Sequence, residues 1–241
     1  MKIEIKHKFT GAVIFAYEKE KNTIKDTIEE AVRLNVSLAF SNLAYSYLEY
    51  SNFENANFEN CNFEYCNLKN CNLQNCNFES ANFKNASLQN ADFENCNFKN
   101  ANLKNASLEN CNLESADLQN ASLQNANFEY SNLEKANLTA IKEDFFEILS
   151  KAPKEIGGLK KALINGNING CAYEGDCCCL VGTIANVRGC NYTELEGIIP
   201  NNSRPAERWF FGIKVGDTPK NSKIAKITLD WINEYETLKN K

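Results

Sequence analysis

Large hydrophobic residues return every five positions through the middle of the chain. The stretch CNFEYCNLKNCNLQNCNFES, residues 61–80, shows the pattern at Phe63, Leu68, Leu73 and Phe78. An α-helix has a period of 3.6 and a β-strand a period of 2, so neither element explains this spacing. We call each large apolar residue a centre. The centres continue without interruption from Leu43 to Leu138, which gives 20 units of five residues each.

The positions around each centre are equally regular. Two residues before it the chain has Ala, Cys or Ser, and directly before it mostly Asn. The two residues after it are polar, and a weaker unit, VSLAF at 36–40, precedes the series. Periodic Leu and Phe argue against disorder, and a coiled coil needs a period of seven. One large and one small inward position per unit predict a solenoid in which four units close each turn of twenty residues.

Residues twenty apart are therefore expected to stack. One such column of centres is Phe58, Phe78, Phe98, Leu118 and Leu138. Cys76 and Cys96 fall in a column of small residues, and we interpret the repeat cysteines as small buried hydrophobes. No glycine lies between Gly11 and Gly157, so Asn, which tolerates left-handed conformations, is expected to form the corners. Stacked Asn side chains can also form ladders between turns.

The A-N-L and C-N-F units over residues 41–140 resemble the pentapeptide repeat family. This resemblance implies a right-handed quadrilateral β-helix of about five coils. We expect a mainly β protein with three parts. They are an N-terminal ββα cap at 1–35, the repeat β-helix at 36–140 and a mainly helical domain at 141–241.

The ends have ordinary helix and strand patterns. Residues 2–16 predict a β-hairpin, and Thr23 with Asp26 predicts a capping box for the following helix. Further helices are expected at 141–151, at 153–166, near 177–187 and near 221–238. The segment YEGDCCCLVGTIANVRGC resembles C-terminal regions joined to pentapeptide repeats in bacterial and prophage-encoded proteins, and that resemblance implies no chemistry.

The net charge of −5 is unevenly distributed. Residues 41–140 carry −7, while 1–40 and 141–241 carry +1 each. A general nucleic-acid binder has a basic face instead, so we expect no direct nucleic-acid binding. No run approaches the roughly 18 apolar residues of a membrane span, and MKIEIKHKFTGAVIF lacks a signal-peptide pattern. We therefore expect a cytoplasmic protein without a membrane association.

The sequence offers little for catalysis or for a cofactor. Zinc sites usually pair ligands as C-x₂₋₄-C, and three adjacent cysteines on a helix cannot all face one ion. His7 is the single histidine, GGLKK lacks the phosphate-loop spacing, and Cys–His chemistry needs a positioned base. We expect no enzyme, no metal and no cofactor. A metal or redox role stays a third alternative for Cys171, Cys177, Cys178, Cys179 and Cys190.

One outward column of the predicted coil is acidic. We call its carboxylates, with Asp92 beside them, the acidic stripe: Glu54, Asp92, Glu94, Glu114 and Glu134, interrupted by Gln74. One interpretation is a solvated face that keeps the coil soluble. The other is a partner site, because the resemblance implies relatives that mimic DNA in shape and charge and act on DNA gyrase. Five lysines and the absence of an inserted loop in 41–140 weaken the second interpretation.

Together these patterns predict a non-enzymatic module that binds an unidentified protein partner. The stripe is one candidate surface. The C-terminal domain is the other, where Trp209, Phe210 and Phe211 lie near Arg204 and Arg208. Large aromatic residues more often form a core than an interface. The alternative function is a DNA mimic that acts on a topoisomerase. The sequence leaves the oligomeric state open.

Overall fold

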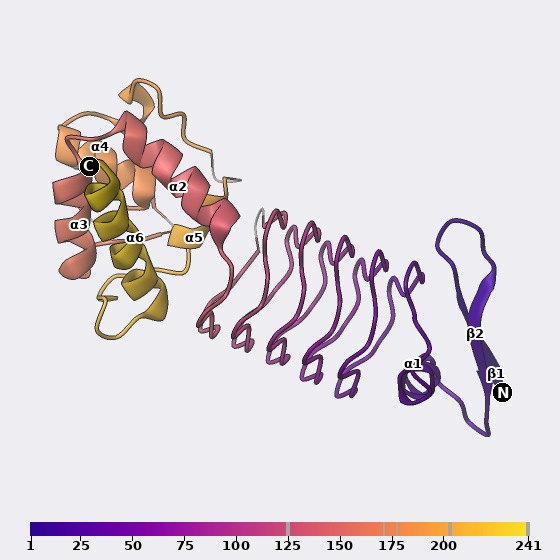
Figure 1. Ribbon diagram of the computed structural model, residues 1–241. Helices are drawn as coiled ribbons and strands as arrows, with labels where there is room; N and C mark the ends of the chain where they lie inside the picture. The colour runs from indigo at the N-terminus through magenta and orange to yellow at the C-terminus, as the bar shows by residue number, and fades with distance from the viewer. Residues whose placement is uncertain (124–125, 171, 177, 202–203, 240–241) are drawn as a thin grey trace. The chain divides into compact units, whose positions relative to one another are not determined.

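The computed structural model describes residues 1–123, 126–170, 172–176, 178–201 and 204–239 (Figure 1). The chain divides into two compact units, Met1–Thr139 and Ala140–Lys241. Within the described ranges, no helix combines the length and the apolar character that a membrane crossing requires. Each unit has its own hydrophobic core.

The first unit begins with the expected hairpin and helix. Strand β1, Lys2–Lys6, pairs antiparallel with β2, Val13–Glu18, and helix α1 covers Ile24–Arg33. The capping box is confirmed. Thr23 Oγ1 accepts from the Asp26 amide at 3.1 Å, and Asp26 Oδ2 accepts from the Thr23 amide at 3.0 Å. Strand β2 extends beyond the expected hairpin limit of residue 16.

Hairpin and helix cover the first turn of the coil. The Asn42 amide donates to the Lys6 carbonyl at 2.9 Å, and the Lys8 amide donates to the Phe40 carbonyl at 2.8 Å. Helix α1 turns its fully buried Ile28 and Ala31 inward. An uncovered end turn would leave core side chains and strand edges in water, so this arrangement is a cap.

The coil itself is a parallel ladder with a repeat of twenty residues. Bridges join residues twenty apart, from Asn42↔Asn62 to Asp117↔Asn137. Each turn thus has four five-residue sides, and twenty centres make five turns. The weaker unit also belongs to the coil, because the amide of the buried Leu38 donates to the Asn57 carbonyl at 3.0 Å. The right-handed sense stays a prediction.

Stacked rings fill the interior of the coil. Phe58 and Phe78 lie 5.6 Å apart with an interplanar angle of 3°, and Phe78 and Phe98 lie 5.1 Å apart at 19°. Leu118 and Leu138 are also buried. Burying each such side chain contributes about 1.5–3 kcal/mol, so the column is a main source of stability.

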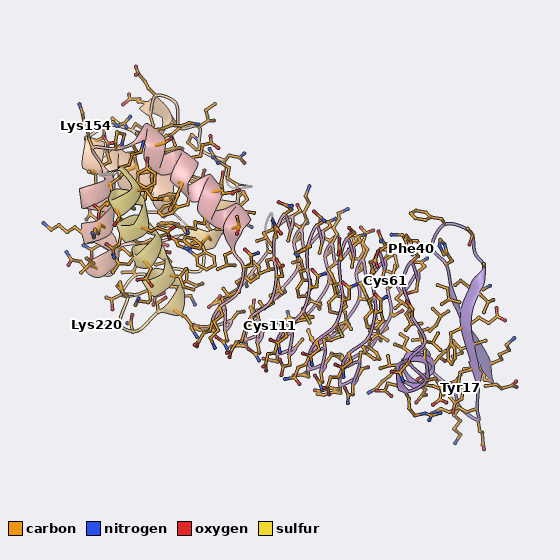
Figure 2. The ribbon with its side chains drawn as sticks, viewed as in Figure 1. Tyr17, Phe40, Cys61, Cys111, Lys154 and Lys220 are labelled. Carbon is orange, nitrogen blue, oxygen red and sulfur yellow. The ribbon has the colours of Figure 1, made fainter. Side chains whose placement is uncertain are left out.

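The repeat cysteines do more than fill space. Each donates its Sγ–H to the carbonyl of the centre 23 residues earlier, as Cys76 does to Phe53 at 3.0 Å. Figure 2 labels the first and last of them on the coil. The six thiols that make this bond are Cys61, Cys66, Cys71, Cys76, Cys96 and Cys111. A thiol is a weak donor, but it gives the carbonyl a further hydrogen bond that an alanine side chain cannot supply.

Every described corner from Phe40 to Lys135 is left-handed. The second residue after each centre has a φ between 56° and 64°, and eleven of these nineteen corners are Asn. The next amide closes the turn, as Ala56 does by donating to the Phe53 carbonyl at 3.1 Å. A positive φ at the third turn position alone is the pattern of a type II turn.

The Asn directly before each centre has a second role. The side chain of Asn82 accepts from the Lys84 amide at 3.2 Å and donates to Asn62 Oδ1 at 3.0 Å. The second bond joins one turn to the next, and Asn102 continues the series by donating to Asn82 at 2.9 Å. The expected Asn ladders are present.

The second unit is helical, as expected. Its elements are α2 (Thr139–Lys151), α3 (Ile156–Ile164), α4 (Leu180–Arg188), the short 3₁₀ helix η1 (Tyr192–Glu194), α5 (Pro205–Phe210) and α6 (Lys223–Lys239). The helix expected from Pro153 begins at Ile156, because a turn closes first from the Glu155 amide to the Ala152 carbonyl. The helix expected near 177–187 begins only at Leu180. Helix α5 was not predicted.

Trp209 and Phe210 belong to the core of the second unit, whereas Phe211 is half-buried. Trp209 is 4% exposed, packs on Trp231 with ring centres 5.2 Å apart, and donates from Nε1 to Thr228 Oγ1 at 2.8 Å. Phe210 is 1% exposed and contacts Phe145. Neither side chain can therefore form the docking surface considered from the sequence.

Substitutions at Cys96 test whether the small residue of each repeat unit faces the interior of the coil. Cys96→Ala removes one atom and one hydrogen bond, so we expect a loss of about 1–2 kcal/mol in the free energy of unfolding. Cys96→Ser keeps a donor for the Leu73 carbonyl, 2.9 Å from Sγ, and should lose less. Cys96→Trp overfills the coil and should abolish folding. Urea denaturation followed by circular dichroism measures all three, and a well-folded Trp variant would contradict the inward assignment.

Candidate functional site

The structure brings the middle of the acidic stripe together around Gln74. Gln74 Nε2 donates to Asp92 Oδ2 at 3.0 Å and to Glu94 Oε2 at 3.1 Å. These residues belong to successive turns of the coil. The glutamine that interrupts the column in the sequence therefore bridges two of the stripe carboxylates, Asp92 and Glu94, by hydrogen bonds.

The remaining stripe carboxylates also have neighbours. Glu114 accepts from Lys135 Nζ at 3.3 Å and from Asn132 Nδ2 at 3.4 Å. Glu54, at the first turn, accepts from the side-chain amides of Asn55 and Asn72, each at 3.5 Å, and from no other side chain among the described residues. Glu134 is exposed, whereas the others are half-buried. The least strongly engaged of the half-buried carboxylates is thus at the α1 end of the stripe.

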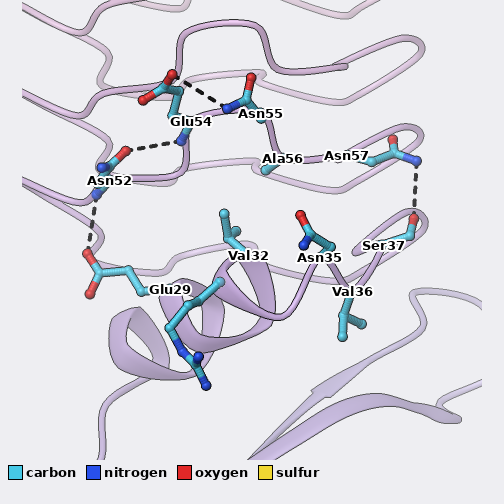
Figure 3. Close-up of a pocket in the computed structure, with 11 residues that line it drawn as sticks. Glu29, Val32, Asn35, Val36, Ser37, Asn52, Glu54, Asn55, Ala56 and Asn57 are labelled. Atoms are coloured by element: carbon cyan, nitrogen blue, oxygen red, sulfur yellow. Dashed lines mark hydrogen bonds between the residues drawn. The ribbon is translucent and has the colours of Figure 1, made fainter.

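A cavity of about 520 Å³ lies beside Glu54, between α1 and the coil (Figure 3). Val32, Val36 and Ala56 give it an apolar part. Glu29 and Glu54 flank Asn52 at one side. Sequence reasoning missed this cavity, because residues of α1 and of the coil line it together only after the helix has packed on the coil.

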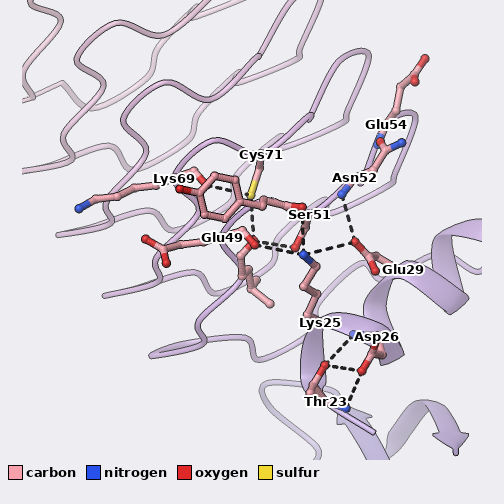
Figure 4. A network of polar contacts seen from close by, with 12 residues as sticks. Thr23, Lys25, Asp26, Glu29, Glu49, Ser51, Asn52, Glu54, Lys69 and Cys71 are labelled. Atoms are coloured by element: carbon pink, nitrogen blue, oxygen red, sulfur yellow. Dashed lines mark hydrogen bonds and ion pairs between the residues drawn. The ribbon is translucent and has the colours of Figure 1, made fainter.

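A polar network holds α1 on the coil beside this cavity (Figure 4). Lys25 Nζ donates to the carbonyls of Glu49 at 3.2 Å and Tyr50 at 2.9 Å. Glu29 Oε1 accepts from the Asn52 amide at 3.2 Å and lies 4.0 Å from Lys25 Nζ. Both side chains bond to backbone groups of the coil, so the helix cannot shift without breaking these bonds.

Four exposed tyrosines lie on the first two turns. We call Tyr45, Tyr47, Tyr50 and Tyr65 the tyrosine group, which are 68%, 80%, 70% and 49% exposed. The rings of Tyr45 and Tyr65 stack 5.1 Å apart at an angle of 9°. Sequence reasoning missed this group, although a signal was present, because all four replace the Asn or small polar residue of other units.

Three of these tyrosines occupy left-handed corners. Their φ angles are 61° at Tyr45, 60° at Tyr50 and 57° at Tyr65. The left-handed region costs an L-residue about 1–2 kcal/mol, and Asn visits it more readily than an aromatic residue does. Large exposed rings at strained corners add little to the packing of the coil.

The C-terminal cysteines form no described metal centre. Cys171 and Cys177 lie outside the described residues. Cys178 and Cys179 are buried and Cys190 is half-buried. In the described part of the chain no group of three or more His, Cys, Asp or Glu side chains has a metal-binding arrangement. His7 is on the hairpin, where its ring stacks on Phe40 at 5.4 Å.

The buried Glu207 of the second unit is held by hydrogen bonds that serve the fold. Glu207 is 0% exposed and accepts from Tyr173 Oη at 2.6 Å and from the Asn201 amide at 2.8 Å. Burial, followed by the bond to Glu207, raises the pKa of the Tyr173 hydroxyl. The pair ties two loops to α5, and the sequence pattern gave no sign of it.

Comparison with known proteins agrees with the geometry of the coil. A family model described as a pentapeptide repeat region matches residues 46–114. A second model, described as pentapeptide repeats in eight copies, matches residues 101–139. A comparison with curated protein sequences gave no match.

Several solved structures match part of this chain. A pentapeptide repeat protein from the thylakoid lumen of Arabidopsis thaliana is 22% identical, with a TM-score of 0.38 over 46% of this chain and 71% of its own. Rfr23 from the cyanobacterium Cyanothece 51142 is 27% identical, with a TM-score of 0.26. QnrB1, a plasmid-mediated fluoroquinolone resistance protein, is 22% identical, with a TM-score of 0.30. For each of the last two, 39% of this chain matches 62% of the other, less than two thirds of its length.

Burial should protect the repeat thiols from alkylation. Desolvation raises the pKa of Cys66 to about 12 and that of Cys61 to about 11, so both stay protonated at neutral pH. We expect N-ethylmaleimide to label Cys190 in the folded protein well before any repeat cysteine. Peptide mass spectrometry measures the labelling. Modification of Cys66 as fast as in denatured protein would contradict its burial.

The same shifts predict alkaline destabilisation. The folded-state pKa of Cys66 lies above the ordinary thiol value of 9.0, so the unfolded chain loses this proton first. The stabilisation is complete below pH 9 and is lost as the pH rises from 9 toward about 12. Thermal melts across this range should show the loss, with a shallower decline for Cys66→Ala. An equal decline in both proteins would contradict the linkage.

Proposed function

Because residues 46–139 form a pentapeptide repeat region, we propose that this chain is a non-catalytic protein-binding module. Its scaffold is the right-handed quadrilateral β-helix that the resemblance implies. The observation that carries the proposal is the tyrosine group, which is 49–80% exposed on the first two turns. The partner is a protein, and the module works in the cytoplasm, where free thiols stay reduced.

Tyrosine suits this role for physical reasons. A tyrosine side chain offers a large amphipathic contact area with few rotatable bonds, and tyrosine is enriched at the energetic centres of interfaces. The stack of Tyr45 on Tyr65 holds two rings in place before a partner arrives. Binding then loses less side-chain entropy than it would with free rings.

The departure from the repeat rule supports a selected role. Asn occupies eleven of the nineteen described left-handed corners, so the coil folds well with Asn there. Tyr45 and Tyr50 accept a less favourable backbone conformation and leave their rings in water. Residues that break a local rule without a structural gain are expected at functional sites.

The acidic stripe indicates a second property of the partner, a basic surface. The acidic stripe begins at Glu54 and has five carboxylates, of which Glu114 accepts from Lys135 Nζ. Complementary charge steers association and selects partners more than it adds affinity. A partner with basic residues beside an apolar patch therefore fits this module. A DNA-like acidic face that acts on a topoisomerase is the alternative that the stripe would support.

Non-catalytic action is part of the proposal. His7 is stacked on Phe40, and the buried Glu207 is already bonded to Tyr173 and to a backbone amide. Neither group is placed as a general base beside a nucleophile in an open cleft. These placements support binding rather than chemistry.

The double variant Tyr45→Asn/Tyr50→Asn tests the proposal. Its thermal stability should equal or exceed that of the parent, because Asn suits both corners. Affinity capture from a lysate of the source organism, quantified by mass spectrometry, should lose the partner. Tyr130→Asn is the matched control. It makes the same change at another exposed left-handed corner, with φ 59°, and should keep the partner.

A third variant separates the two functions. Glu94→Gln/Glu114→Gln weakens the stripe and leaves the tyrosines unchanged. Loss of the partner in the double tyrosine variant alone would support the proposal. Equal capture by the parent and that variant would contradict it. Loss only in the glutamine variant, with a topoisomerase as the captured protein, would favour the DNA mimic.

A further inference from the structure

We infer that residues 46–50, one side of the first turn, bind an extended basic segment of a partner protein, which adds to the coil as a further strand. The inference specifies the partner of the proposed function and rests on it. Tyr45 is the corner before this side, and Tyr47 and Tyr50 belong to it. The exposed rings and an open backbone edge therefore coincide.

The residue directly before each centre normally makes two backbone bonds toward the preceding turn. In the second turn, the Asn67 amide donates to the Ser46 carbonyl at 3.0 Å, and the Asn67 carbonyl accepts from the Leu48 amide at 2.8 Å. In the first turn, residues 41–60, the cap must supply both partners or leave these groups open.

The cap supplies a partner on three of the four sides of the first turn. The three bonds are from the Asn42 amide to the Lys6 carbonyl at 2.9 Å, from the Asn52 amide to Glu29 Oε1 at 3.2 Å, and from the Leu38 amide to the Asn57 carbonyl at 3.0 Å. On the fourth side, Tyr47 has no partner for its N–H or its C=O among the described residues. Tyr47 is also 80% exposed, so neither α1 nor the hairpin covers it.

The tyrosine at position 47 opens a third backbone group. In other units the Asn before the centre accepts from the amide two residues later, as Asn52 does from Glu54 at 3.2 Å. Tyrosine has no carboxamide oxygen for this bond, and the Glu49 amide has no acceptor in the described part of the chain. An incoming extended segment offers the alternating N–H and C=O groups that such an edge pairs with.

The open edge is not an unfinished end of the core. Leu48, the centre of this side, is fully buried. Lys25 Nζ donates to the carbonyls of Glu49 at 3.2 Å and Tyr50 at 2.9 Å (Figure 4). The cap thus covers the interior and the last carbonyls of this side, and it leaves the strand edge at Tyr47 accessible. Such an edge is a template for another strand.

The surrounding side chains indicate the composition of the segment. Tyr45 and Tyr50 are 68% and 70% exposed, and they offer ring surface at the two ends of the side. β-branched residues pack well against aromatic rings across a strand pair. The Glu49 side chain is exposed and has no ion pair among the described residues. A Lys or Arg beside the β-branched residues complements that carboxylate.

Hydrogen exchange of the full ¹⁵N-labelled chain, followed by nuclear magnetic resonance, tests the inference. The probe is the peptide acetyl-Lys-Val-Val-Val-Lys-amide. Without it the Tyr47 amide should exchange freely, whereas the Asn67 amide should be protected by its bond to Ser46. Saturating probe should slow exchange at Tyr47 about tenfold. No saturable binding, or no slowing at Tyr47, would overturn the inference.

A matched peptide separates backbone pairing from side-chain contact. The same peptide with its three valines N-methylated keeps the side chains and the charge but loses the valine N–H donors. Its Kd should be about tenfold higher, because one or more backbone hydrogen bonds are lost. Equal affinity of the two peptides would overturn strand pairing.

Two variants at one position give an independent test. Tyr47→Ala removes the ring and keeps the N–H, whereas Tyr47→Pro removes both. Proline is tolerated on an edge strand where the N–H faces outward. The Kd of the probe should be about tenfold higher for the Pro variant than for the Ala variant. Unchanged amide signals in distant turns would show that both variants fold, and an equal Kd would then overturn the inference.

The remaining outcomes separate the occupants and the two proposals. Protection of the Tyr47 amide without the probe, lost on dilution, would assign the edge to a second copy of this chain and overturn the partner segment. Protection by the probe with no loss of partner in the double tyrosine variant would retain the edge and reject the tyrosine surface. Loss of partner in that variant without protection by the probe would retain the tyrosine surface and reject strand pairing.

Discussion

Backbone hydrogen bonding between successive turns is the constraint on which the first unit depends. Each centre amide from Leu43 to Leu118 donates to the carbonyl nineteen residues later, as Phe53 does to Asn72 at 2.8 Å. This register permits only twenty residues per turn, and four equal sides then require a corner every five residues. Each five-residue side must end in a tight turn. This requirement explains the small inward residue, the left-handed corner, and the Asn before the centre that accepts from a backbone amide.

Because the repeat is regular, outward residues that depart from it can be recognised. The backbone ladder positions the outward side chains, which contribute little to the core. Folding therefore places little restriction on the residue type at these positions, and they can be used to bind a partner. A tyrosine in place of Asn at a left-handed corner costs conformational free energy. Three such corners lie on the first two turns, together with the exposed Tyr47. Glu54, the half-buried stripe carboxylate with the weakest hydrogen bonds, lies there too. The proposed binding surface therefore lies where the cap meets the coil.

Much of this architecture was predictable from the spacing of residues. The period of five identified the sides, the inward column through Phe58, Phe78 and Phe98, and the two uses of Asn. The Thr23 capping box was also readable, because its chemistry is local. The thiol bonds were not, since the bond from Cys76 to Phe53 needs the register of two turns. The cavity was missed for a similar reason, because α1 and the coil form it only through tertiary packing. In the second unit no repeat constrains the boundaries, and α5 and the start of α3 depend on side-chain packing and turns.

The most direct test of the account is the thermal unfolding of a variant in which residues 81–100 are duplicated. These twenty residues form one complete turn, so the added turn should pair with both neighbours and keep every column in register. Circular dichroism should then show cooperative unfolding with a Tm no lower than that of the parent, as expected when repeat and interface stabilities add. A variant with one alanine inserted after Asn90 should lose register and stability. An unfolded duplication, or an insertion variant as stable as the parent, would contradict the twenty-residue register.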